Sequence, residues 1–181
     1  MNYANIKYCD IADGVGVRTT LFVSGCSHHC KGCFQPETWD FAAGEPFTEE
    51  VAQQIIDSLA PTYIDGLTLL GGEPMEPENQ GPLADLCERA KAAYPDKSIW
   101  CYTGDCYEDL IPGGSRHTED TDRLLACIDV LVDGPFIEDQ KDITLRFCGS
   151  ANQRLIDLNA TRAAGEVVFW TDDPVFSTHT M

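Results

Sequence analysis

Residues 15–34 read VGVRTTLFVSGCSHHCKGCF, a run of β-branched and apolar residues that ends in closely spaced cysteines. The first half of this stretch predicts a strand that leads directly into a loop. Cys26, Cys30 and Cys33 follow with three and then two residues between them, and Phe34 comes next. Three thiols rarely fall at such spacing by chance, so this loop is the first candidate for chemistry.

The composition of the 181-residue chain is ordinary for a globular protein, but its charge is not. Hydrophobic residues make up 43% and charged residues 23%, which argues against disorder and predicts one domain with an apolar core. The formal net charge of −18 repels phosphate backbones and anionic lipid heads. We therefore expect no nucleic acid and no membrane as partner, and a protein with a basic face fits better.

The start of the chain lacks the basic residues and apolar run of an export signal, and no apolar stretch of about eighteen residues occurs. We expect a cytoplasmic protein, in which thiols stay reduced. The chain has nine cysteines, and an odd number speaks against a disulfide framework. Metal binding or thiol chemistry explains the cysteine loop better.

Strand and helix patterns alternate along the rest of the chain. Thr48 is the predicted N-cap of a helix that ends before Pro61, and an apolar strand over 67–70 stops at Gly71 and Gly72. The further expected elements are a helix over 81–95, strands over 98–104 and 129–136 with two short helices between them, and late strands over 152–158 and 166–170. Apolar strands joined by helices predict βαβ units and a parallel sheet.

The carboxyl ends of parallel strands meet at one edge of a sheet, where chemistry gathers. Four loops that follow strand ends are therefore expected to line one mouth. They are the cysteine loop, Gly71-Gly72-Glu73-Pro74, Thr103-Gly104 and Asp133-Gly134-Pro135.

Three interpretations of the cysteine loop are open. Cys30 and Cys33 have the spacing of a redox dithiol. Zinc binds Cys and His, and His28 and His29 lie between the thiols, although structural zinc sites usually take two separated ligand pairs. Three thiolates also suit a cubane iron-sulfur cluster, which leaves a fourth iron open to an external molecule. The adjacent histidines are expected to face solvent or to support the ligands.

The cysteine motif resembles that of the radical S-adenosylmethionine (SAM) superfamily, which is CxxxCxxC followed by an aromatic residue. The segments GVGVRTTLFVSGCSHHCKGCFQPETWDF, GLTLLGGEPM, WCYTG, DVLVDGPFIEDQKD and GSANQRLIDL are similar, in this order, to the activating proteins of anaerobic ribonucleoside-triphosphate reductase. The similarity runs with gaps from Ile6 to Leu158. It implies one radical SAM activase domain over 1–158, with 159–181 as a C-terminal extension packed on that domain or trailing from it.

The resemblance implies a [4Fe-4S] cluster held by Cys26, Cys30 and Cys33, with SAM chelated to the open iron. A one-electron donor such as flavodoxin or ferredoxin would reduce the cluster, and SAM would be cleaved to methionine and a 5′-deoxyadenosyl radical. In an activase this radical removes a hydrogen atom from a backbone glycine of the large catalytic subunit of the reductase. That subunit is the expected partner, and the chain is expected to be a radical SAM oxidoreductase.

The resemblance also places residues beside SAM, and it implies no catalytic residue beyond the cluster and the cofactor. Gly71, Gly72 and Glu73 match the segment whose backbone meets the methionine amino group, since a ligand can approach glycine closely. Phe34 would lie near the adenine, and Asp133 would accept a ribose hydroxyl. The full cofactor-binding set is Gly32, Cys33, Phe34, Gly71, Gly72, Glu73 and Asp133.

The chain is too short for a full eight-unit barrel, so the resemblance implies an incomplete parallel β/α barrel of the radical SAM type. Its open side would admit a protein substrate. A radical SAM enzyme acting on a small molecule, of the deazapurine-forming type, is one alternative, and an electron-transfer iron-sulfur protein is another.

Four further residues carry separate expectations. Cys101 and Cys106, with four residues between them, leave a second metal conceivable. Cys148 stands where relatives commonly have arginine. A contact that this arginine makes with a partner or substrate in the relatives is therefore not expected here. Arg18 is expected to form a surface ion pair, the commoner fate of an arginine.

Overall fold

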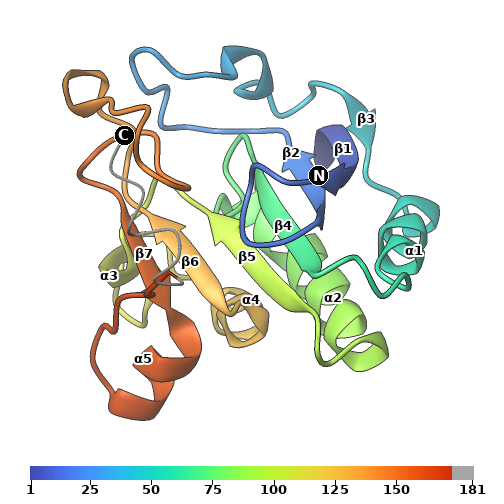
Figure 1. The fold of residues 1–181 in the computed structure, drawn as a ribbon. Coiled ribbons are helices and arrows are strands. Elements are labelled where there is room, and N and C mark those ends of the chain that lie inside the picture. Colours follow the sequence, from blue (N-terminus) through green and yellow to red (C-terminus); the bar gives the residue numbers. More distant parts are fainter. Residues whose placement is uncertain (173–181) are drawn as a thin grey trace.

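In the computed structural model, which describes residues 1–172, seven strands form one open sheet in the order β3-β1-β2-β4-β5-β6-β7 (Figure 1). The four central strands are parallel: β2 (Arg18–Val23), β4 (Gly66–Gly71), β5 (Ser98–Tyr102) and β6 (Val130–Asp133). The antiparallel edge strands are β1 (Asn2–Asp10), β3 (Glu45–Pro46) and β7 (Arg154–Asp157). The predicted α/β fold is confirmed, and the sheet is parallel at its centre but, unlike the predicted parallel sheet, antiparallel at both edges.

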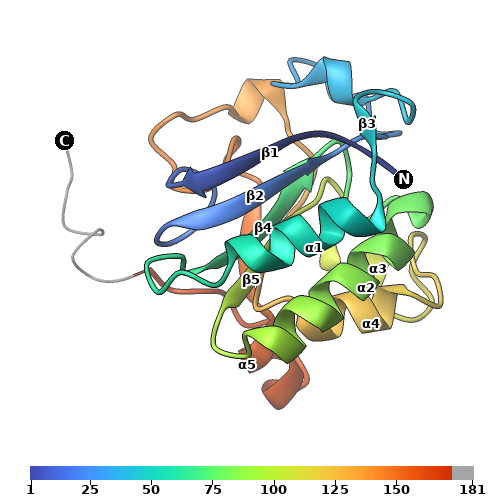
Figure 2. The ribbon, with the colours of Figure 1, turned by 90° about the vertical axis from the view of Figure 1, so that its right-hand side faces the viewer.

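Helices connect the parallel strands and cover one face of the sheet, as Figure 2 shows for the first, second and fourth of them. They are α1 (Glu49–Ser58), α2 (Pro77–Ala93), α3 (Tyr107–Leu110) and α4 (Thr121–Cys127), and α5 (Leu158–Ala164) follows β7. Short 3₁₀ turns lie at Pro36–Thr38 and Glu138–Gln140. This right-handed succession of strand, helix and strand brings all four parallel strands to end at the same edge.

Local sequence explains where the helices begin. The Thr48 hydroxyl accepts a hydrogen bond from the backbone N–H of Val51 at 3.4 Å, the capping predicted for α1. The second helix starts at Pro77, four positions earlier than predicted. Pro77 occupies the first turn, where its missing N–H costs nothing, and the pattern of apolar residues that guided the prediction begins only later.

The apolar core fills the space between the sheet and its helices. Leu21, Leu67, Leu69, Ile99 and Leu131, one or two from each parallel strand, are at most 1% exposed. Burial of this kind supplies the main free energy that holds α1 and α2 against the sheet.

The predicted surface ion pair of Arg18 is wrong, because its side chain is fully buried at the start of β2. The guanidinium donates to Thr68 Oγ1 at 2.7 Å, to the Leu67 carbonyl at 2.8 Å and to both the hydroxyl and the carbonyl of Ser98 at 2.9 Å. It also donates to the Val15 carbonyl at 3.0 Å. Burial lowers its pKa to about 10, so Arg18 is still a cation at neutral pH. Its side chain joins the amino ends of three parallel strands, β2, β4 and β5.

Three features near the ends of the chain differ from the prediction. Strand β1 was not predicted, because its residues are mostly exposed and show no regular apolar alternation. The predicted strand over 166–170 is reduced to a single bridge between Phe169 and Ile156. The predicted domain boundary at 158 falls at the first residue of α5, and residues 173–181 of the predicted extension lie outside the described residues.

Among residues 1–172, no helix has the length and apolar character needed to cross a bilayer.

Candidate metal centre

A cavity of about 490 Å³ lies at the carboxyl ends of the parallel strands. All four predicted loops contribute to its wall, so the expectation that they meet is confirmed. The lining residues from these loops are Cys26, His28, Cys30, Cys33, Phe34, Gly71, Gly72, Glu73, Thr103, Gly104 and Gly134.

Backbone hydrogen bonds close the cysteine loop on itself. The N–H groups of Gly25 and Cys26 donate to the carbonyls of Thr38 and Trp39 at 2.8 and 3.1 Å. Within the loop, the Cys33 N–H donates to the Cys30 carbonyl at 3.1 Å. This bond closes a tight turn in which Gly32 has φ +74°, a conformation that favours glycine.

The three thiols share one cavity without gathering around one point. Within residues 1–172, two groups of potential ligands have all their ligand atoms within 4.8 Å of one another, and the cysteine triplet is neither of them. Thiolates on a single tetrahedral zinc would lie about 3.8 Å apart, given Zn–S bonds of about 2.3 Å. The wider spread suits a cubane in which each cysteine holds a different iron.

The cysteines differ in their surroundings. Cys26 is buried, whereas Cys30 and Cys33 are half-buried. Burial raises the pKa of the Cys26 thiol to about 11, so the free thiol holds its proton at neutral pH. A metal that binds Cys26 must displace this proton, which links metal binding to proton release.

The two glycines after β4 let its loop lie directly against the cysteine loop. The N–H groups of Gly72 and Glu73 donate to the carbonyls of Val23 and Gly25, each at 2.8 Å. A Cβ on Gly72 would stand 2.6 Å from the Gly25 oxygen, and Gly71 has φ +112°. Close packing against the cysteine loop therefore explains Gly72, whereas the positive φ and the contact with Val23 of β2 explain Gly71. Sequence reasoning did not offer these reasons.

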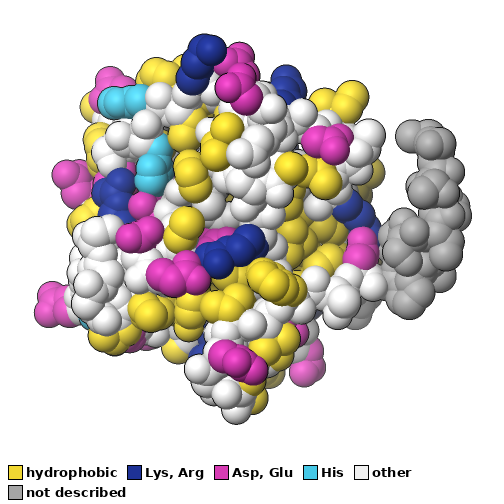
Figure 3. All heavy atoms as spheres, turned by 90° about the vertical axis from the view of Figure 1, so that its left-hand side faces the viewer, with side chains coloured by type: hydrophobic (Ala, Val, Ile, Leu, Met, Phe, Trp, Pro, Cys, Tyr) yellow, Lys and Arg dark blue, Asp and Glu magenta, His cyan; other side chains and the backbone are white. Residues whose placement is uncertain are grey.

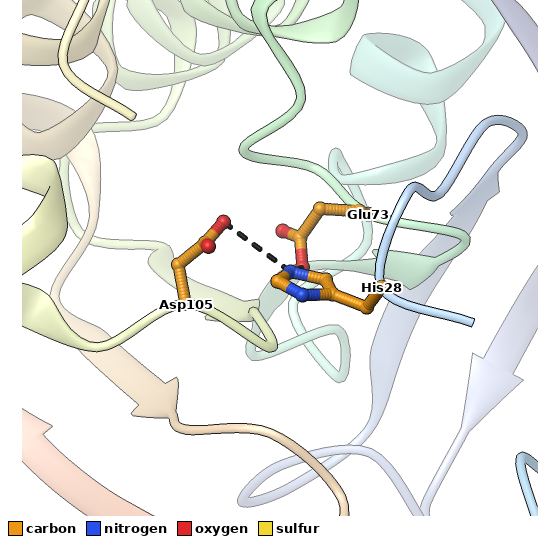
Figure 4. A group of neighbouring side chains, drawn as sticks. All are labelled: His28, Glu73 and Asp105. Carbon is orange, nitrogen blue, oxygen red and sulfur yellow. Dashed lines mark ion pairs between the residues drawn. The ribbon is translucent and has the colours of Figure 1, made fainter. Parts of the chain in front are cut away.

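Glu73 joins the Thr103-Gly104 loop to the cysteine loop and the Gly71-Gly72 loop. Its carboxylate is 1% exposed and accepts the N–H groups of Met75 at 2.8 Å and Gly104 at 2.7 Å. His28 Nε2 lies 3.4 Å from the Asp105 carboxylate and 3.1 Å from that of Glu73 (Figure 4). These carboxylates, Asp105 first, raise the pKa of His28 to about 10, so the ring is an imidazolium at neutral pH.

Phe34 stands at the exposed edge of the cavity. Its side chain is 66% exposed, its ring centroid lies 5.3 Å from that of Phe136, and Lys141 Nζ lies 4.9 Å from it. An aromatic face beside an open cavity suits a flat heterocycle.

Gly32 and Asp133 are not among the described residues that line the cavity. Asp133 is fully buried, and its carboxylate accepts from Arg154 Nε at 2.9 Å and from the Tyr107 N–H at 2.8 Å. Its acceptors are thus occupied within the chain, and the contacts give no support to a ribose hydroxyl at this position.

Sequence reasoning missed several residues of the cavity wall, among them Lys7, Asp13, Trp39, Tyr102 and Cys148. Tyr102 directly precedes the Thr103-Gly104 loop, so its place at a strand end was a usable signal. Asp13 lies in the connection between β1 and β2, and β1 was not predicted. Cys148 precedes β7, which was predicted, but the sequence did not indicate that the segment before this strand borders the cavity. Burial raises the pKa of Cys148 to about 11.

Cys101 and Cys106 do not meet in one group of potential metal ligands among the described residues. Cys101 is fully buried in the core. Cys106 has its sulfur near the carboxylates of Glu108 and Asp133, but Arg154 pairs with both of these carboxylates. This ion pairing explains the acidic group without a metal.

The face that contains β7 and the loop before it mixes charge with apolar surface (Figure 3). Hydrophobic side chains gather across its middle, and acidic side chains lie beside basic ones.

Comparison with known proteins decides the family. A family model described as a 4Fe-4S single cluster domain matches residues 12–156. The anaerobic ribonucleoside-triphosphate reductase-activating protein of Vibrio cholerae is 44% identical over 155 residues, which cover 84% of this chain and 96% of the relative. Its counterpart in Escherichia coli K12 is 41% identical with the same coverage, and that of Enterobacteria phage T4 is 38% identical over 86% of this chain and 93% of its own.

This chain belongs to the family of anaerobic ribonucleoside-triphosphate reductase-activating proteins. The thiols of the cysteine loop fit the 4Fe-4S cluster that the family model describes. Three of them line one cavity, and they are spread too widely for a single ion. The residues that would hold the cluster are Cys26, Cys30 and Cys33.

Proposed function

We propose that this chain is the activase of an anaerobic ribonucleoside-triphosphate reductase. It binds a [4Fe-4S] cluster and SAM in the cavity and generates a glycyl radical on the large catalytic subunit of the reductase. When bound, the reduced cluster would supply one electron to SAM, which would be cleaved to methionine and a 5′-deoxyadenosyl radical. This radical would abstract the hydrogen atom of the glycine. The observation that carries the proposal is the continuous wall formed by the cysteine loop and the Gly71-Gly72-Glu73 loop in a member of this family.

The residues of the wall have separable tasks in this proposal. Cys26, Cys30 and Cys33 hold the cluster through their thiolates. Gly71 and Gly72 present backbone atoms to the methionine part of SAM. Glu73 positions that backbone, because its carboxylate is already occupied by two N–H groups and by His28. Phe34 supplies an aromatic face for the adenine.

The fold supports a partial barrel of the radical SAM type. Lys7 from β1 and Gln153 beside β7 line the same cavity, although their strands stand near opposite ends of the sheet order. A sheet whose two ends border one cavity must curve around it. The curved, unclosed sheet leaves a side for a protein segment to enter, and residues 1–158 would form this catalytic domain.

The expected surroundings of the enzyme follow from its chemistry. A low-potential one-electron donor such as flavodoxin or ferredoxin reduces the cluster. Electron transfer and thiolate ligation both suit the reducing cytoplasm.

The test is a coupled assay under anaerobic conditions. The chain is reconstituted with iron and sulfide, reduced, and mixed with SAM and the large reductase subunit from the same organism. We expect 5′-deoxyadenosine, methionine and the electron paramagnetic resonance (EPR) doublet of a glycyl radical, all absent from Cys30→Ser. SAM cleavage without a glycyl radical would favour a small-molecule substrate, and failure to bind iron would overturn the proposal.

A further inference from the structure

Arg116, in the connection between α3 and α4, reaches across to the cysteine loop. Its Nη2 donates to Ser27 Oγ at 2.7 Å, and Ser27 directly follows the ligand Cys26. Its Nη1 donates to Glu76 Oε2 at 3.0 Å, and its Nε donates to Asp105 Oδ1 at 3.1 Å. One guanidinium therefore contacts the loops after β2, β4 and β5.

Glu76 also holds Ser27. Its Oε1 accepts the backbone N–H of Ser27 at 2.7 Å and the Ser27 hydroxyl at 2.5 Å. Ser27 is thus held by its backbone and by its side chain. Fixing Ser27 fixes the backbone on one side of Cys26, since adjacent residues share a peptide plane.

The same residues carry a concentrated negative charge next to the ligand loop. The carboxylates of Glu73, Glu76 and Asp105 belong to residues that are 1%, 4% and 7% exposed. Arg116 and the imidazolium of His28 are the cations paired with them among the described residues. Without Arg116, Glu76 would lose the one cationic partner that it has among residues 1–172, in a chain whose net charge is already −18.

We propose that Arg116 is a positioning residue for the metal centre: it clamps the cysteine loop through Ser27 and offsets buried negative charge beside the cluster. The clamp is the set Ser27, Glu76, Asp105 and Arg116. The inference rests on the proposed function only in that the cysteine loop holds a cluster. The clamp itself consists of contacts within the chain and orders the loop before the metal arrives.

Arg123 in α4 is the matched control. It pairs with three carboxylates, those of Asp85, Glu88 and Asp120, at 2.6 to 2.8 Å, where Arg116 pairs with two. These contacts lie on the helices, and none of the four residues lines the cavity. Replacing Arg123 removes a similar number of ion pairs without touching the cysteine loop.

The first measurement is hydrogen–deuterium exchange of residues 24–35 in the full-length chain without metal. We expect exchange about tenfold faster in Arg116→Gln than in the original chain, because several charge-assisted hydrogen bonds are lost. Ser27→Ala should also speed exchange, whereas Arg116→Lys should restore part of the protection. Arg123→Gln should leave these residues unchanged.

The second measurement is the midpoint potential of the bound cluster, from an EPR-monitored redox titration. Loss of a nearby cation disfavours the added electron, so we expect a more negative potential in Arg116→Gln and recovery in Arg116→Lys. Ser27→Ala keeps the cation and should keep the potential. A lost hydrogen bond alone would not give this pattern.

The outcomes separate the inference from the function. Exchange and potential in Arg116→Gln that equal those of Arg123→Gln would overturn the clamp, whether or not SAM is cleaved. If Arg116→Gln does not fold, Ser27→Ala decides the clamp by exchange and Arg116→Lys decides it by potential. A chain that binds no iron would overturn the proposed function, while exchange in the metal-free chain would still decide the clamp.

Discussion

Two arginines join loops and strands at opposite ends of the parallel sheet, and they do so by different means. At the amino ends, Arg18 is fully buried and donates to neutral carbonyl and hydroxyl oxygens of β4, β5 and the preceding turn. At the carboxyl ends, the Arg116 side chain is 21% exposed and contacts two carboxylates and a hydroxyl. The comparison separates a scaffold from a site. The neutral acceptors around Arg18 hold the strands together, whereas the charged groups around Arg116 also set the electrostatic surroundings of a metal in the cavity.

The largest functional effect should come from the ligands themselves. Cys30→Ser removes one thiolate, so we expect loss of stable cluster binding and of detectable SAM cleavage, with the fold retained because Cys30 is only half-buried. Iron and sulfide content together with 5′-deoxyadenosine yield measure it. Cys9→Ser, at an exposed cysteine outside the cavity, should keep full iron content. Equal iron content in both variants would contradict the assignment of ligands.

The largest effect on stability should come from the opposite end of the sheet. Arg18→Met leaves five buried or half-buried acceptors without their donor, so we expect the free energy of unfolding to fall by about 3–5 kcal/mol. Urea denaturation followed by circular dichroism measures it, with Arg123→Met as the control at under about 1 kcal/mol. A similar loss of unfolding free energy in the two variants would contradict the claim that Arg18 stabilises the fold more than a surface arginine does.

A substitution at the contact of two site loops should affect both stability and chemistry. In Gly72→Ala the new methyl group meets the Gly25 and Thr38 oxygens at 2.6 and 2.9 Å, so the cysteine loop must shift. We expect a loss of about 1–3 kcal/mol and SAM cleavage at least about tenfold slower.

The control is Gly81→Ala in α2, where the nearest atom is the flexible Asp120 carboxylate at 2.9 Å. This variant should cleave SAM at the original rate. Normal cleavage by Gly72→Ala would show that the loops need not pack this closely.

The smallest expected effect concerns a carboxyl group in the cavity wall. Burial, followed by the neighbouring Asp10, raises the pKa of Asp13 to about 7. Between its unfolded value of 3.8 and about pH 7 the folded chain binds the extra proton, so this group makes stability fall as pH rises through that window. Asp13→Asn should remove this contribution, which amounts to about 1 kcal/mol after allowance for solvent screening.

Urea midpoints of the two chains at pH 5.5 and pH 8 measure the difference. We expect the stability gained by Asp13→Asn over the original chain to be larger at pH 8 than at pH 5.5, because the penalty grows from about pH 3.8 and is complete only near pH 7. A constant difference at both pH values would show that Asp13 titrates normally in the fold.

The sequence allowed the parallel strands, α1 and the meeting of four loops to be predicted, because strand patterns and Thr48 capping are local signals. It gave no sign of Arg18's burial, since the five acceptors of its side chain come from residues up to 80 positions away. The edge strand β1 was not predicted because it is mostly exposed. For this reason the place of Asp13 in the cavity wall was not predicted either. The clamp around Ser27 could not be predicted for the same reason as the burial of Arg18: the two contacts of Ser27 come from residues 49 and 89 positions away.

The central claim is that three thiolates hold a [4Fe-4S] cluster and leave one iron for SAM. The most direct measurement is electron–nuclear double resonance on the reduced cluster with SAM labelled by ¹⁵N in its amino group or ¹⁷O in its carboxylate. The account predicts a hyperfine coupling from each label, present in the Cys9→Ser variant and absent without SAM. A reduced cluster that shows no coupling to either label, with all its irons ligated by the protein, would contradict it.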